Sequence, residues 1–162
     1  MKFEFSSMVA IGEIAPDFTT NDSDGHPFHL ADLRGKQRVV LYFFPKCFTT
    51  GCDIEGKGFR DQFPRYQGNG TQIIGVSADP PDVAQAFRKK FELPFPVLPD
   101  PDKKVIQLYG VQGMFGLARR VTFQIGLDGR VENVVDSMRP GPHIDKTLKE
   151  LEKSSPPSTP PG

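Results

Sequence analysis

The sequence predicts an α/β fold in which a mixed central β-sheet is flanked by helices. Two almost wholly apolar runs, "RVVLYFF" at 38–44 and "TQIIGVS" at 71–77, are typical of strands covered on both faces. Segments with the amphipathic period of helices follow these runs. Nearer the C-terminus, the Asp128-Gly129 step separates two strand-like runs and predicts a hairpin, which adds antiparallel strands. This order is typical of an α/β sandwich of the thioredoxin type.

The remaining strands are predicted to be short. "FPVL" at 95–98 has strand composition, and "VTFQI" at 121–125 and "RVENVV" at 130–135 flank the hairpin turn. "DSDGHPF" at 22–28 is predicted to be a turn followed by a strand.

Four segments are predicted to be helical: 53–67, 81–92, 101–110 and 142–153. The first is predicted although its glycines and Pro64 lower its helical propensity. The second is expected to begin with Asp79 as its cap, and the third is expected to stop at Gly110. The last helix places Ile144, Leu148 and Leu151 on one face.

Length and composition predict one domain of residues 1–153, followed by a disordered tail at 154–162 that is rich in proline and serine. Lysine plus arginine (20) balances aspartate plus glutamate (20), so we expect no nucleic-acid or membrane partner. No secretory signal and no membrane span are apparent, which predicts a cytoplasmic protein. Cytoplasmic thiols are kept reduced, so a close cysteine pair there is more often catalytic or metal-binding than structural.

Both cysteines of the chain lie in the stretch "FFPKCFTTGC" at 43–52. Four interpretations are open for it: a metal clip, a structural disulfide, a redox pair, or one reactive thiol with an incidental neighbour. Cys52 falls at or just before the first turn of the helix that starts with "DIE". Free N–H groups and the positive end of the helix dipole favour a thiolate there. Cys47 lies in the preceding loop, outside that field, and its thiol is expected to behave more ordinarily.

Pro45, Thr49 and Cys52 form the pattern P-x-x-x-T-x-x-C, and "TTGCDIE" resembles the active-site segment of peroxiredoxins, which are thiol peroxidases. Collinear segments that include "GEIAPDF", "LADLRGK", "IIGVSAD" and "RVTFQI" resemble the bacterioferritin comigratory protein and peroxiredoxin Q branch. The resemblance covers about residues 10–150. It implies a thioredoxin-like fold of the peroxiredoxin type, hydroperoxide as the substrate, and thioredoxin or another thiol as the reductant.

The resemblance also implies a role for each matching residue. Cys52 would be the peroxidatic cysteine, whose thiolate attacks the peroxide and becomes a sulfenic acid. Thr49 would bind the peroxide, and Pro45 would wall the pocket. Arg120 of "RVTF" would stabilise the thiolate and the charge on the leaving oxygen. Glu55 could orient that arginine or serve only as an acid in the first helical turn.

One position departs from the branch, whose members often carry a resolving cysteine five residues after the peroxidatic one. That position is Lys57 here, and a cysteine lies five residues before instead, at Cys47. Cys47 could attack the sulfenic acid and form an internal disulfide, or it could be a bystander while an external thiol resolves the intermediate. Spacing alone does not show whether the two residues approach closely enough for a disulfide.

The other interpretations are weaker. His26 and His29 lack the further ligands of a zinc site, and "NDSDG" lacks the glutamate of a calcium loop, so no metal or other cofactor is expected. A disulfide oxidoreductase would need a C-x-x-C motif. A redox-switched holdase chaperone or peroxide sensor that uses Cys52 is the alternative function. A monomer is expected from the resemblance.

Overall fold

A computed structural model describes residues 7–154 of the chain. Its strands are β1 (Thr19–Asn21), β2 (Pro27–His29), β3 (Arg38–Phe43), β4 (Thr71–Ser77), β5 (Val97–Pro99), β6 (Val121–Ile125) and β7 (Val131–Asp136). Its helices are α1 (Thr50–Asp61), α2 (Phe63–Gly68), α3 (Pro81–Lys90), α4 (Lys104–Leu108) and α5 (Pro140–Ser154), with the short 3-10 turns η1 (Leu30–Leu33) and η2 (Met114–Gly116).

Five strands form one mixed sheet in the order β5-β4-β3-β6-β7. The β3–β4 and β4–β5 pairs are parallel, whereas β3–β6 and β6–β7 are antiparallel. Strands β1 and β2 form a separate antiparallel pair. The mixed sheet flanked by helices confirms the predicted fold class.

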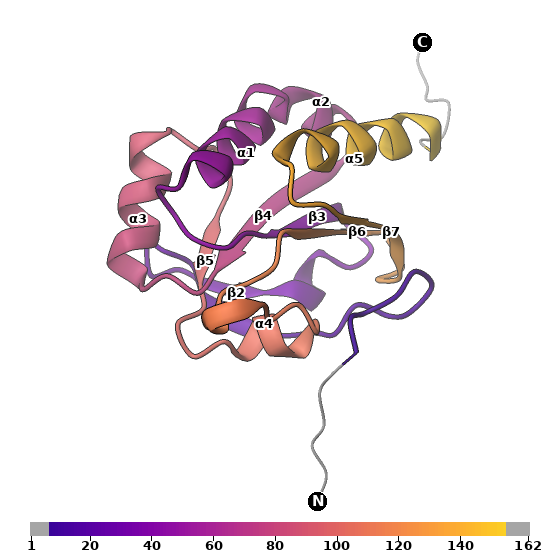
Figure 1. The fold of residues 1–162 in the computed structure, drawn as a ribbon. Helices are drawn as coiled ribbons and strands as arrows, with labels where there is room; N and C mark the ends of the chain where they lie inside the picture. Colours follow the sequence, from indigo (N-terminus) through magenta and orange to yellow (C-terminus); the bar gives the residue numbers. More distant parts are fainter. Residues whose placement is uncertain (1–6, 155–162) are drawn as a thin grey trace, which may run out of the picture.

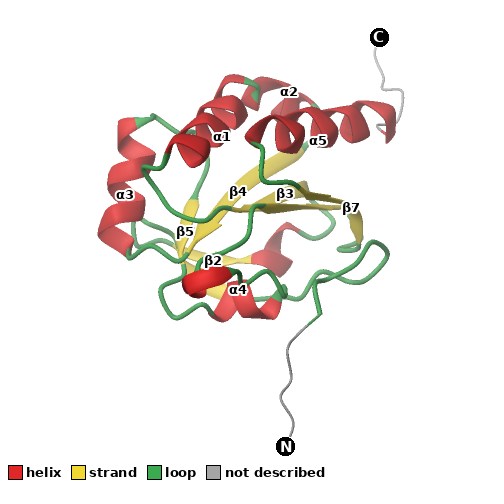
Figure 2. Ribbon diagram, in the orientation of Figure 1, coloured by secondary structure: helices red, strands yellow, loops and turns green. Residues whose placement is uncertain are grey.

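Successive residues of β3 point to opposite faces of the sheet and belong to two different hydrophobic cores. Val39, Leu41 and Phe43 belong to the core on the side of α4, whereas Val40 and Tyr42 belong to the core under α1, α2 and α5. Figures 1 and 2 show α1, α2 and α5 together on one side of the sheet, with α4 and β2 on the other. Helices on both faces explain why the central strands are apolar at nearly every position.

The first predicted helix is two helices in the structure. Helix α1 begins three residues earlier than expected, at Thr50, and the helical path breaks at Gln62 before α2. Pro64 lies in the first turn of α2, where the N–H that proline lacks has no intrahelical acceptor. The earlier start places Cys52 firmly inside the first turn of α1.

Other predictions differ at element ends. Asp79 does not cap α3, because Pro80 is the cap residue and makes no side-chain cap bond. The Asp79 carboxylate instead accepts the Cys47 backbone N–H and the Ser77 hydroxyl. The hairpin at Asp128-Gly129 is confirmed, with β6 and β7 on either side. Of the predicted tail, Ser154 is the last residue of α5, and residues 155–162 lie outside the described part of the chain.

Candidate active site

The sheet register brings the two halves of the candidate site together. Phe43, the last residue of β3, pairs with Val121, the first residue of β6. The loop that leaves β3 and leads to Cys52 therefore starts at the sheet edge where Arg120 precedes β6. Residues 68 positions apart in the sequence meet there because β3 and β6 are antiparallel neighbours.

Cys52 lies in the first turn of α1 with only 1 % of its surface exposed. Asp53 is the first residue of α1 whose N–H bonds back along the helix, to the carbonyl oxygen of Thr49. The N–H groups before it therefore lack intrahelical acceptors and, with the helix dipole, create a positive field near the sulfur. The predicted position of Cys52 at the helix start is confirmed.

The Arg120 guanidinium is the group that contacts the sulfur. Its Nη1 and Nη2 atoms each lie 3.7 Å from the Cys52 Sγ, and its Nε donates to the Met138 carbonyl oxygen at 3.0 Å. Arg119, the neighbouring candidate, points the other way and pairs with Asp136 at 2.6 Å, with both side chains about 43 % exposed. Adjacent residues of an extended chain face opposite sides, and Arg120 is the one of the two arginines that reaches the sulfur.

Glu55 lies one turn after Cys52 on the buried face of α1. Its Oε1 accepts a hydrogen bond from Arg120 Nη1 at 2.6 Å, so Glu55 is in a position to orient that arginine. Its Oε2 is buried without a hydrogen-bond partner. Burial raises the pKa of Glu55 to about 8, although the Arg120 charge opposes this shift.

His143 closes the far side of this cluster and was not anticipated from the sequence. Its Nε2–H donates to the Ser137 carbonyl oxygen at 2.8 Å, so the other ring nitrogen, Nδ1, accepts the Thr122 hydroxyl at 2.7 Å. Nδ1 also lies 3.8 Å from Glu55 Oε2. Burial lowers the pKa of His143, as does the charge of Arg120, and both favour a neutral ring.

Gly51 is the second residue that sequence reasoning missed. A Cβ atom at this position would lie 2.7 Å from Arg120 Nη2, well inside contact distance. The absence of a side chain at position 51 therefore makes room for the guanidinium beside the sulfur. The only available signal was the glycine directly before the reactive cysteine.

Thr49 and Pro45 occupy the loop between β3 and α1. Thr49 precedes the helix and is exposed, but its hydroxyl donates to the Lys46 carbonyl oxygen at 2.8 Å and does not cap α1. Pro45 lines a groove of about 560 Å³ together with Arg120. Arg119 and Asp136 also line this groove, and its further apolar side chains are Met114, Phe115, Leu117, Ala118 and Met138. Cys52 is not in its lining, so Arg120 links the groove to the sulfur.

Cys47 is buried in the same core as Cys52, and both thiols are free. Its backbone N–H donates to Asp79 Oδ2 at 2.8 Å, and its Sγ lies 3.8 Å from the Ser77 hydroxyl. Burial raises the pKa of the Cys47 thiol far above its ordinary value, and the Asp79 charge raises it further. The expectation of an ordinary loop thiol was therefore wrong, because the structure buries Cys47 beside a carboxylate.

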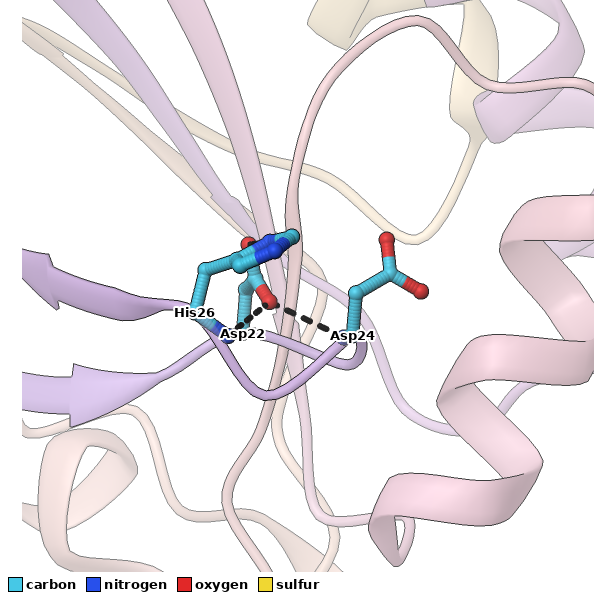
Figure 3. Close-up of side chains that lie close together, drawn as sticks. All are labelled: Asp22, Asp24 and His26. Carbon is cyan, nitrogen blue, oxygen red and sulfur yellow. Dashed lines mark hydrogen bonds and ion pairs between the residues drawn. The ribbon is translucent and has the colours of Figure 1, made fainter.

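Within residues 7–154, the side chains that most resemble a set of metal ligands lie in the acidic turn before β2. They are Asp22, Asp24 and His26. Asp22 Oδ1 accepts the backbone N–H groups of Asp24 and His26, each at 2.9 Å, as expected for a turn. Figure 3 shows Asp24 beside Asp22 and His26, but the Asp24 carboxylate is bound by Arg88 Nη1 at 2.9 Å. These contacts account for the turn, so it carries no metal assignment.

Replacing Gly51 by alanine is expected to displace the Arg120 guanidinium from Cys52, because the new methyl group and Nη2 cannot share the same space. We expect the rate of Cys52 oxidation by peroxide to fall by about tenfold or more, since a positioned charged donor is lost. Gly68→Ala is the matched control, because a Cβ there meets no atom within 4 Å. Stopped-flow oxidation should be unchanged in the control; equal rates in both variants would contradict this role for Gly51.

The buried Glu55 carboxyl is expected to make stability depend on pH. The pKa of Glu55 is about 8 in the folded protein and 4.5 in a solvated chain, so the unfolded chain loses this proton first as pH rises. The contribution of Glu55 to the free energy of unfolding is therefore full below pH 4.5. It is lost as pH rises toward 8, by at most about 1.4 kcal/mol per pH unit. Denaturant unfolding of Cys52→Ser with and without Glu55→Gln isolates the effect. A free-energy difference that stays constant over this range would contradict it.

Comparisons with known proteins agree with the geometry. Residues 11–134 match the AhpC/TSA family. The chain is 35 % identical over 149 residues to peroxiredoxin Bcp of Escherichia coli (strain K12), covering 88 % of this chain and 95 % of that protein. It is 36 % identical over 149 residues to the chloroplastic peroxiredoxin Q of Gentiana triflora, covering 90 % of this chain and 68 % of that protein.

Among solved structures, the crystal structure of peroxidoxin BcpB from Mycobacterium tuberculosis aligns with a TM-score of 0.84. It is 31 % identical to the chain and covers 90 % of this chain and 98 % of its own. Family, relatives and fold all agree with the resemblance stated from the sequence. The chain therefore belongs to the AhpC/TSA family and is a peroxiredoxin of the Bcp and peroxiredoxin Q branch, a thiol peroxidase.

Proposed function

We propose that the protein reduces hydroperoxides through a sulfenic acid at Cys52. The Cys52 thiolate attacks the terminal peroxide oxygen, the O–O bond breaks, and the remaining oxygen leaves and takes up a proton as water or an alcohol. Cys52 is thereby oxidised from a thiolate to a sulfenic acid. The established peroxidase class of the family requires a reactive cysteine, and Cys52 is the residue that best fits this role.

One contact carries this assignment: both terminal nitrogens of Arg120 lie 3.7 Å from the Cys52 sulfur. A cation this close favours the thiolate and also stabilises negative charge as it develops on the leaving oxygen. The pair is buried, so water screens the attraction less than it would at the surface. Cys47 has the opposite environment, because Asp79 places negative charge beside it.

Thr49 and Pro45 complete the proposed peroxide pocket. The Thr49 hydroxyl can accept the peroxide O–H while it keeps its own hydrogen bond to Lys46. Pro45 limits access to the sulfur from the groove side. The apolar lining beyond Arg120 fits the carbon chain or ring of an organic hydroperoxide, so we propose that such compounds are reduced as well as hydrogen peroxide.

We further propose that Cys47 resolves the sulfenic acid and that thioredoxin or another thiol reductant reduces the resulting disulfide. Burial of both cysteines in one core supports this route. We still predict that the protein is a monomer and acts in the cytoplasm. We also predict that it binds neither nucleic acid nor a membrane. None of the helices in residues 7–154 is long and apolar enough to span a bilayer.

The assignment is tested by peroxide turnover with a thioredoxin reducing system. Cys52→Ser should lose all turnover, and Arg120→Ala should lose about a hundredfold or more because it removes the cation at the sulfur. With hydrogen peroxide as the substrate, Arg119→Ala is the matched control, since that neighbouring arginine pairs with Asp136 and not with Cys52. Retained turnover in Cys52→Ser would refute the peroxidatic role. If Cys52→Ser protected a client protein from aggregation as well as the wild type does, the result would instead indicate a chaperone.

The groove is tested by comparing an aromatic hydroperoxide with hydrogen peroxide. Phe115 is 89 % exposed at its rim, so Phe115→Ser removes apolar contact area from the groove without altering the core. We expect kcat/KM for cumene hydroperoxide to fall about three- to tenfold, with hydrogen peroxide unaffected. Leu127→Ser, at an exposed leucine outside the groove, should change neither value. Equal losses for both peroxides would contradict the proposed substrate site.

A further inference from the structure

A buried chain of hydrogen bonds holds Cys47, and the proposed peroxide reaction does not use it. Asp79 Oδ2 accepts the Cys47 backbone N–H at 2.8 Å and the Ser77 hydroxyl at 2.8 Å. The Cys47 Sγ lies 3.8 Å from that same hydroxyl. All three residues are buried at the end of β4 and in the loop after β3. One carboxylate thus restrains both the backbone and, through Ser77, the sulfur of Cys47.

The direction of these bonds favours the thiol form of Cys47. Ser77 gives its only hydroxyl proton to Asp79, which leaves its oxygen as an acceptor toward the sulfur. The Cys47 S–H is then the donor, so the arrangement suits the thiol and does not suit the thiolate. A thiolate would face a lone pair of Ser77 and the negative charge of Asp79.

We propose that Asp79 is a positioning residue that slows formation of the Cys47–Cys52 disulfide and so prolongs the lifetime of the Cys52 sulfenic acid. This inference rests on the proposed function of the two cysteines. The delay has two causes. The carboxylate opposes ionisation of Cys47, and its bond to the Cys47 N–H restrains the loop that carries the attacking sulfur.

The affected step is the attack of Cys47 on oxidised Cys52. The Cys47 sulfur forms a bond to the Cys52 sulfur, the S–O bond of the sulfenic acid breaks, and the leaving hydroxide takes up the proton that Cys47 loses, giving water. Cys47 is oxidised and Cys52 is reduced in this step, so no further reactant is required. Its rate depends on the fraction of Cys47 present as thiolate.

The titratable groups that act on Cys47 come from three elements. Asp79 follows β4, Cys52 lies on α1, and the buried Tyr42 hydroxyl lies on β3. Tyr42 stays neutral because burial raises its pKa, and Cys52 is uncharged once it is a protonated sulfenic acid. Asp79 is therefore the negative group that remains beside Cys47 when resolution takes place.

The test uses full-length protein that is reduced, mixed with one equivalent of hydrogen peroxide and quenched with acid at successive times. Intact mass then distinguishes sulfenic acid from disulfide. Asp79→Asn keeps an oxygen acceptor for Cys47 and Ser77 but removes the charge, and we expect disulfide formation at pH 7 to accelerate about tenfold. Asp82→Asn, an exposed acid on α3, makes the same charge change away from Cys47 and should have no effect.

Ser77→Ala separates the effect of the Asp79 charge from the effect of freeing the Cys47 sulfur from its hydroxyl neighbour. It removes the hydroxyl between the sulfur and the carboxylate but keeps the Asp79 charge, so disulfide formation should not accelerate. Acceleration equal to that of Asp79→Asn would show that freeing the sulfur from the Ser77 hydroxyl, and not removing the Asp79 carboxylate charge, is the cause, and it would overturn the proposal. Slower resolution in Asp79→Asn would also overturn it, because Asp79 would then act as a proton acceptor.

Wild-type protein gives a check that does not depend on the folding of any variant. Disulfide formation should rise about tenfold per pH unit through the neutral range, as expected for a thiol that is almost wholly protonated. A rate that is already constant at neutral pH would overturn the proposal. Sulfenic acid at Cys52 without any disulfide in any variant would reject this inference and leave the peroxidase assignment intact. No oxidation of Cys52 would reject the proposed function itself.

Discussion

A buried guanidinium connects the fold of this protein to its chemistry. Arg120 lies inside the protein with about a tenth of its surface exposed, and a buried cation is costly unless negative groups and hydrogen-bond acceptors surround it. The Glu55 carboxyl, the Met138 carbonyl oxygen and the Cys52 sulfur supply them. The sulfur is thus one of the partners that make this arginine stable, and in return it is held next to positive charge.

This arrangement depends on the sheet more than on local sequence. The antiparallel β3–β6 pair places the start of β6 beside the loop that follows β3, and the parallel β3–β4 pair places the end of β4 there as well. Arg120 directly precedes β6, Cys52 lies on α1, and Ser77 is the last residue of β4. One edge of the sheet therefore gathers two cysteines with opposite electrostatic environments, one beside a guanidinium and the other beside a carboxylate.

The sequence predicted those parts of the site that are set by local pattern. Cys52 at a helix start follows from the apolar strand and the polar segment after it, and Arg120 follows from the alternation of side chains along a strand together with the family pattern. The fold class follows from the alternation of buried strands and amphipathic helices. The break at Gln62 was not predicted, although Pro64 was a visible reason for it.

The residues that were missed act through tertiary contacts. His143 looks like an ordinary polar residue near the start of the last helix, and only the packing of α5 on β6 brings it to Thr122 and Glu55. Asp79 looked like a helix cap, because aspartate before a proline-initiated helix is typical of one. The folded chain offers it a buried backbone N–H and a hydroxyl instead.

The central claim is that the environment of Cys52, and not its identity as a cysteine, makes it reactive. Stopped-flow oxidation of the Cys47→Ser variant by hydrogen peroxide at neutral pH measures this directly, because residue 52 is then the one remaining thiol. The account predicts a second-order rate constant at least about a hundredfold above that of free cysteine in the same buffer. A rate constant equal to that of free cysteine would contradict it.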